Sequence, residues 1–206
     1  SGKTVFVSTF AVFGTGRCYD QIRQSIAYPK MDIKIVASHA GITVGGDGAS
    51  HQIIEDIALM RVLPNMRVIV PVDSPETYNV VKAVAKMKGP VYVRIGRADV
   101  PTLTEESTPF EMDNAAVMRD GEDVTLIGCG IMVSRCLEAA DELAKHGVDA
   151  RVVNLHTIKP LDERTIVKAA RETGGVVTAE EHSVMMGMGS AVAMCLVENF
   201  HVPMKR

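Results

Sequence analysis

The chain has 206 residues, of which 47% are hydrophobic and 23% charged, and its formal net charge is −3. This length allows one large or two small domains. The charge excludes a basic surface for nucleic acid or an anionic membrane, and no apolar run approaches the ~20 residues that span a bilayer. The four cysteines lack C-x-x-C spacing, which favours a reduced cytoplasmic protein over a disulfide framework.

Short β-branched runs alternate with helical patterns along most of the chain. The predicted strands are 4–7, 33–37, 67–70, 91–95, 124–127, 150–155 and 176–179. The predicted helices are 17–27, 53–62, 76–88, 133–146, 163–173 and 190–199. Ser74 is the expected N-cap of the third helix, since Pro75 follows it. Nearly continuous apolar strands predict an α/β fold with two domains, each a mainly parallel sheet covered by helices on both faces.

The periodicity fails between residues 98 and 122, where Pro101 and Pro109 lie among Thr, Glu, Ser and Asp residues. This composition is typical of a linker. We therefore expect a first domain over 1–97, a linker over 98–122 and a second domain over 123–206. The chain begins just before one strand pattern and stops within another, so we expect a piece of a longer polypeptide, truncated at both ends.

The segment 36–55 is the most informative part of the sequence. His39 and His51 flank Asp47 in a loop that contains four glycines. Neutral imidazole both donates and accepts hydrogen bonds, which suits sugar hydroxyls and proton transfer near pH 7. Asp47 can accept a hydrogen bond from a hydroxyl. A single loop histidine is more often structural, so the hypothesis of a site depends on several such residues meeting.

Other candidates follow neighbouring predicted strands. Phe10 and Phe13 come after the first strand, and Arg94 and Arg97 end the fourth. The carboxyl ends of parallel strands line the ligand crevice, where arginine suits a phosphate or carboxylate. The alternatives are that the phenylalanines are core residues and that Arg94 forms an ion pair. We expect six side chains to surround one cavity: Phe10, Phe13, His39, Asp47, His51 and Arg97.

Glu180, Glu181 and His182 follow the last predicted strand and could suggest a metal site. Consecutive residues of an extended segment point to opposite sides, so three such ligands would converge poorly. A hydrogen-bonded turn or an interface contact is the favoured interpretation. We expect no metal ligands in this chain.

Several motifs together resemble the transketolase family over essentially the whole chain. Those that resemble its pyrimidine-binding domain are S-T-F-A-V-F at 8–13, G-G-D-G-A-S-H-Q at 45–52, L-P-N-M at 63–66 and R-I-G-R at 94–97. Those that resemble its C-terminal domain are I-K-P-L-D at 158–162, E-E-H at 180–182 and the glycines at 187 and 189.

The resemblance implies a thiamine-diphosphate enzyme that moves a two-carbon ketol unit between sugar phosphates, as in the pentose phosphate pathway. It implies that Phe10 and Phe13 stack on the aminopyrimidine of the cofactor. Asp47 and His51 would be the catalytic residues, holding donor hydroxyls, with His51 also assisting proton transfer. His39 and Arg97 would bind the sugar phosphate.

The departures from the family pattern predict an incomplete enzyme. The family's glutamate that pairs with the aminopyrimidine lies upstream of the first strand, and this chain has no acidic residue before Asp20. Gly16 stands where many relatives have a third aromatic residue, and Gly46 replaces a common glutamate. The resemblance therefore implies a C-terminal section, inactive alone, that works with an N-terminal diphosphate-binding section or subunit. That partner would hold most of the thiamine diphosphate and Mg²⁺, in a homodimeric arrangement that shares the cofactor across an interface.

Two other readings stay open at this point. The R-C-Y-D-Q segment at 17–21 also resembles 1-deoxyxylulose-5-phosphate synthase, although 96–101 looks closer to transketolase. The second is a noncatalytic dimerisation or regulatory module, which Gly16 and the missing glutamate favour and which Asp47 and His51 disfavour.

Overall fold

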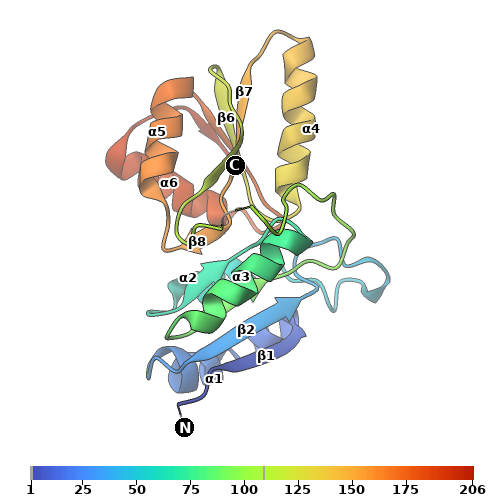
Figure 1. Ribbon diagram of the computed structural model, residues 1–206, viewed down its shortest axis with the longest axis vertical. Helices are drawn as coiled ribbons and strands as arrows, with labels where there is room; N and C mark the ends of the chain where they lie inside the picture. Colours follow the sequence, from blue (N-terminus) through green and yellow to red (C-terminus); the bar gives the residue numbers. More distant parts are fainter. Residues whose placement is uncertain (1, 109) are drawn as a thin grey trace.

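The computed structural model describes residues 2–108 and 110–206. Pro109 of the expected linker therefore lies outside the described residues. Two five-stranded sheets lie one above the other, each with helices on both faces (Figure 1). The predicted α/β fold with two mainly parallel sheets is confirmed.

The first sheet has the strand order β1-β2-β4-β3-β8. Its parallel strands are β1 (Val5–Phe10), β2 (Ile33–Ser38), β4 (Val91–Arg94) and β3 (Arg67–Ile69), and β8 (Thr157–Lys159) pairs antiparallel with β3. The sequence pattern does not predict β8, which follows a strand of the second sheet and returns to the edge of the first.

Helices cover both faces of this sheet because successive strand residues point to opposite sides. The helical elements are the π-helical η1 (Val12–Arg17) and η2 (Ile22–Ala27), the α-helices α1 (Tyr19–Gln21), α2 (Asp56–Val62) and α3 (Ser74–Lys86), and the 3₁₀ turn η3 (Gly45–Asp47). Val80 and Val84 of α3 pack on one face, and Ile57 and Met60 of α2 pack on the other. The first helical region begins at Val12, five residues earlier than predicted.

The second sheet has the order β10-β9-β6-β7-β5. Its parallel strands are β10 (Met204–Lys205), β9 (Val176–Ala179), β6 (Val124–Gly128) and β7 (Ala150–Asn154), and β5 (Ala116–Arg119) is antiparallel. Helix α4 (Met132–Lys145) covers one face, and α5 (Glu163–Thr173) with α6 (Met188–Asn199) covers the other (Figure 1). Strand β5 lies inside the stretch predicted to be a linker, because edge pairing can order a segment that lacks strand periodicity.

The expected N-cap of α3 was wrong by one residue. The Asp73 carboxylate accepts a hydrogen bond from the backbone N–H of Glu76 at 3.0 Å, and Ser74 is the first helical residue. Asp73 also accepts from Leu103 and Thr104 at 2.7 Å, so this carboxylate ties the segment after β4 to the start of α3.

The two sheets point the carboxyl ends of their strands toward each other. A cavity of about 240 Å³ lies between them, lined by Pro71 after β3, Gly96 after β4, Gly130 after β6 and Glu181 after β9. One hydrophobic core runs through both halves of the molecule. None of the helices in the described part of the chain combines the length and the hydropathy that a membrane span requires.

Candidate functional site

The six predicted site residues lie together at the carboxyl edge of the first sheet. They were expected to surround a cavity, but the cavity between the two sheets is lined by other residues. Phe10 ends β1, Phe13 lies in the first turn of η1, and their rings are parallel within 8° at 5.9 Å between centroids. His51, from the glycine-rich loop, meets the edges of both rings at 5.8 and 5.2 Å. His39, directly after β2, stacks on Phe10 at 3.8 Å.

Asp47 lies between a histidine and an arginine in the polar half of this cluster. Its Oδ2 is 3.9 Å from His39 Nε2 and 3.7 Å from Arg97 Nε. Arg97 also donates to the backbone oxygen of Val44 at 2.6 Å, and about half of its side chain remains exposed. This guanidinium is therefore held in place and can still bind an anion from solvent.

The backbone of the loop explains several of its residues. His39 has a φ of 62°, an unfavourable left-handed conformation that structures keep when the surroundings enforce it. A Cβ on Gly45 would come within 2.7 Å of Arg97 Nη1, so that side chain would have to shift. Gly45 also has a φ of 73°, a left-handed conformation that favours glycine. A Cβ on Gly46 would meet nothing within 4 Å, and local packing therefore does not demand a glycine there.

Arg94 forms a buried ion pair. This agrees with the alternative interpretation of the sequence, in which Arg94 is an ion-pair residue and does not bind a ligand. Its Nε donates to Asp56 Oδ2 at 2.7 Å, and the Tyr92 hydroxyl donates to the same oxygen at 2.6 Å. Burial lowers the pKa of Arg94, but the adjacent Asp56 carboxylate more than offsets this and the net pKa is raised. Burial and Asp56 also raise the pKa of the Tyr92 phenol.

Sequence reasoning missed Asp56, which is completely buried at the start of α2. The available signal was an acidic residue among apolar ones at the beginning of a predicted helix. Its partners lie 36 and 38 positions further along the chain, and single-sequence patterns do not specify such pairs.

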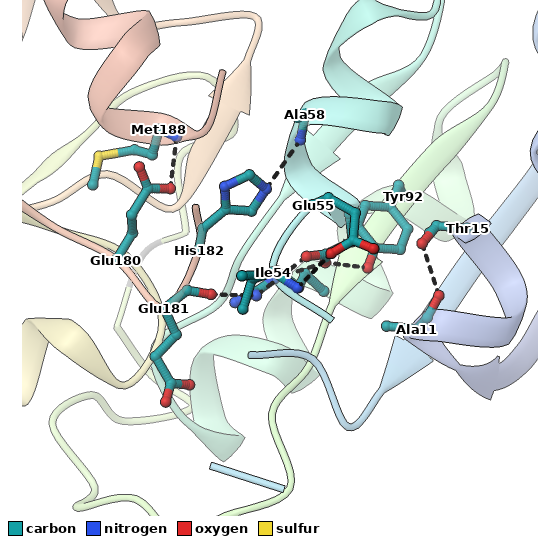
Figure 2. A network of polar contacts seen from close by, with 12 residues as sticks. Ala11, Thr15, Ile54, Glu55, Ala58, Tyr92, Glu180, Glu181, His182 and Met188 are labelled. Atoms are coloured by element: carbon teal, nitrogen blue, oxygen red, sulfur yellow. Dashed lines mark hydrogen bonds and ion pairs between the residues drawn. The ribbon is translucent and has the colours of Figure 1, made fainter. Parts of the chain in front are cut away.

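The Glu180-Glu181-His182 motif makes hydrogen bonds within and between the domains (Figure 2). Glu180 accepts from the N–H groups of Met188 and Gly189 at the start of α6, at 2.7 and 2.8 Å. Glu181 and His182 contact the first domain. The favoured interpretation, a turn with interface contacts, is confirmed. Within residues 2–108 and 110–206, no group of three or more His, Cys, Asp or Glu side chains could hold a metal ion.

Comparison with known proteins agrees with this architecture. The family model for the transketolase pyrimidine-binding domain matches residues 1–102, and that for the transketolase C-terminal domain matches residues 113–206. A putative transketolase C-terminal section of Methanocaldococcus jannaschii is 48% identical over 97% of this chain and 63% of its own length. The 6-deoxy-6-sulfo-D-fructose transketolase subunit SqwH of Clostridium sp. is 42% identical over all of this chain and 64% of its own length.

A solved structure described as a split gene transketolase, inactive beta4 tetramer, superimposes with a TM-score of 0.93. It is 51% identical, and the match covers 99% of this chain and 67% of that one. The chain belongs to the transketolase family. It spans somewhat less than two thirds of the length of the curated relatives named above.

Proposed function

We propose that this chain is the C-terminal section of a split, thiamine-diphosphate-dependent transketolase that transfers a two-carbon ketol unit from a ketose phosphate to an aldose phosphate. The observation that carries the proposal is the single cluster formed by two aromatic rings, two imidazoles, a carboxylate and a guanidinium from four separate segments. The names of the relatives, which include a transketolase section and a transketolase subunit, support it.

The residues present fit the pyrimidine half of the cofactor. Phe10 and Phe13 offer two nearly parallel, partly exposed rings on which a flat heterocycle can stack. The described residues include no metal-binding cluster, so we assign the diphosphate and Mg²⁺ to a partner section. The bound cofactor supplies the carbanion chemistry that breaks and forms the carbon–carbon bond.

The other four side chains would orient the sugar. Asp47 accepts hydrogen bonds from donor hydroxyls, and His51, at the edge of both phenylalanine rings, moves a proton to or from the reacting oxygen. Arg97 binds the terminal phosphate with its exposed guanidinium, assisted by His39. These assignments give catalysis to Asp47 and His51, and substrate binding to His39 and Arg97.

The proposed assembly pairs this chain with an N-terminal, diphosphate-binding section, and two such pairs form the working enzyme. We place it in the cytoplasm, where its free thiols, Cys18, Cys129, Cys136 and Cys195, would stay reduced. Because a relative is named for a sulfonated ketose, the preferred donor is best determined with a panel of ketoses that differ in their terminal anion.

Reconstitution tests this proposal. The chain would be produced with a candidate diphosphate-binding subunit, and ketol transfer from xylulose 5-phosphate would be measured with thiamine diphosphate and Mg²⁺. Transfer by the pair and not by either part supports the proposal. Condensation of pyruvate with glyceraldehyde 3-phosphate would instead indicate a deoxyxylulose-phosphate synthase. Absence of both reactions and of cofactor binding would indicate a noncatalytic module.

A further inference from the structure

The glycine-rich loop that carries Asp47 and His51 is held at its two ends, which we call its first stem (residues 41–43) and its second stem (residues 53–58). The turn after β9 contacts the first stem. The Thr43 hydroxyl donates to Glu181 Oε2 at 3.0 Å. Gly41 lies so close to the Glu181 side chain that an added Cβ would overlap its carboxylate. Glu181 is only 8% exposed, so this carboxylate of the second domain is buried against the first domain.

The same turn contacts the second stem of the loop (Figure 2). The backbone N–H of Ser183 donates to the oxygen of Ile54 at 2.7 Å, and the N–H of Ala58 donates to His182 Nε2 at 3.3 Å. His182 Nδ1 lies 2.8 Å from the Ser183 oxygen. One neutral tautomer, with the proton on Nδ1, satisfies both contacts of the ring.

Arg94 joins this turn to the buried ion pair. Its Nη2 donates to the backbone oxygen of Glu181 at 2.8 Å and to Asp56 Oδ1 at 3.2 Å. Asp56 is the first residue of α2 and lies within the second stem. The Arg94 side chain is 6% exposed, and its hydrogen bonds link the second domain, strand β4 and helix α2.

The loop between the two stems is a closed unit. The N–H of Gly41 donates to the oxygen of Ile53 at 3.0 Å, which bridges the stems. Inside the loop, the N–H groups of Gly48 and His51 donate to the oxygens of Gly45 and Gly48. Most loop residues from 45 to 50 are exposed, so packing alone orders them weakly, and the stems determine where the loop is held.

We infer that Glu181 and His182 are positioning residues through which the second domain holds the catalytic loop in place. This inference rests on the proposed ketol-transfer function. Within the part of the chain that the structure describes, no hydrogen bond or ion pair joins either side chain to the six-residue cluster. Their effect acts through Thr43 and Ala58, which flank the segment with Asp47 and His51. A displacement of about 1 Å at reacting groups can cost up to about 100-fold in rate, so such a support affects turnover more than cofactor binding.

Hydrogen exchange of the whole chain tests whether Glu181 and His182 hold the loop, and it requires no measurement of activity. In Glu181→Ala, we expect the amides of residues 41–53 to exchange about tenfold faster, the equivalent of one lost hydrogen bond to a charged group. Thr43→Val removes the same bond from the other side with a smaller change of shape and should give a similar result. Glu181→Gln keeps an acceptor for Thr43 and should restore slow exchange. Glu198→Gln, an exposed site on α6, is the matched control.

His182 is tested separately at the second stem. We expect His182→Ala to accelerate exchange at Ala58 and the start of α2, because the backbone N–H loses its acceptor. Wild-type exchange at residues 41–58 in all three of Glu181→Ala, Thr43→Val and His182→Ala would overturn the inference. So would a uniform acceleration across both domains, since it would show a general loss of stability.

Kinetics of the reconstituted pair complete the test. Glu181→Ala should lower kcat by about 10- to 100-fold with little change in cofactor affinity, and Glu181→Gln should recover most of the loss. Equal loss of kcat and cofactor affinity would contradict a positioning role. If the wild-type pair shows no ketol transfer, the proposed function fails, and hydrogen exchange still decides whether the second domain holds the loop.

Discussion

The two sheets of this molecule share one plan and differ in what their loops carry. Each has four parallel strands and one antiparallel edge strand. At the carboxyl ends of the first sheet, the loops present aromatic, imidazole, carboxylate and guanidinium groups to one another. At the carboxyl ends of the second, Glu180 holds the start of α6, and Glu181 and His182 contact the first domain. In our proposal, the same architecture provides a chemical site in one half and a support for it in the other.

The largest expected effect removes the carboxylate that pairs with buried Arg94 in the first domain. Asp56→Ala leaves Arg94 buried without its carboxylate, and an uncompensated buried charge costs about 3–5 kcal/mol. Urea unfolding should show this loss. The control is Glu138→Ala, which removes an exposed pair with Arg135 on α4 and should cost less than about 1 kcal/mol. Similar losses in both variants would show that the buried Asp56–Arg94 pair contributes no more than a surface pair.

The second prediction tests the proposed site in the first domain. In the reconstituted enzyme, His51→Ala should lower kcat about 100-fold, or about 2.7 kcal/mol of barrier, because a positioned proton-transfer group is lost. Cofactor affinity should change little. His146→Ala, at an exposed histidine of the second domain, should leave kcat unchanged. Equal loss of turnover and cofactor binding would identify His51 as a structural residue.

The third prediction concerns two titratable groups at the boundary of the halves. Burial raises the pKa of Glu76 from 4.5 to about 7 and lowers the pKa of His156 from 6.5 to about 4. Between pH 4.5 and 7 the folded state keeps a proton on Glu76 that the unfolded state releases. The contribution of Glu76 to the free energy of unfolding therefore falls as pH rises. Between pH 4 and 6.5 the unfolded state protonates His156 and the folded state does not, so that contribution rises with pH.

Glu76→Gln should remove the contribution of Glu76 to stability, which falls with pH, and leave the contribution of His156, which rises with pH. The amide can be accommodated, because Asn154 Oδ1 is buried beside it without a hydrogen-bond partner among the described residues. We expect the variant to be about 3 kcal/mol more stable than the wild type at pH 8 and nearly equal at pH 4.5. Urea midpoints across this range measure the difference, with Glu138→Gln as an exposed control. A pH-independent difference would contradict the assignment.

The smallest expected effect concerns the aromatic pair. Phe13→Ala in the reconstituted enzyme should weaken cofactor binding about three- to tenfold, in line with about 0.5–1.5 kcal/mol for an aromatic contact. Tyr28→Ala, at a ring that is 80% exposed, should have no effect. Titration of the cofactor measures both. Unchanged affinity in Phe13→Ala would exclude this ring from the cofactor site.

Much of the fold could be predicted because its signals are local. Seven strands and most helices follow from apolar runs and their punctuation. Loops at strand ends, together with the family resemblance, pointed to the six candidate site residues, whose roles stay proposals. Strands β5 and β8 could not be predicted, because antiparallel partners at the sheet edges define them. The sequence offered two good capping residues in a row, Asp73 and Ser74, and contacts of Asp73 with Leu103 and Thr104, about thirty positions away, favour Asp73.

The sequence by itself determined which residue types stand at the ends of the parallel strands, since periodicity and glycine placement act over a few neighbouring positions. Only the tertiary structure decided that Asp47 lies between His39 and Arg97, and that Glu181 reaches Thr43 across 138 positions. Contacts of this range depend on how the two sheets pack, and the packing of large surfaces has no short-range pattern in the chain.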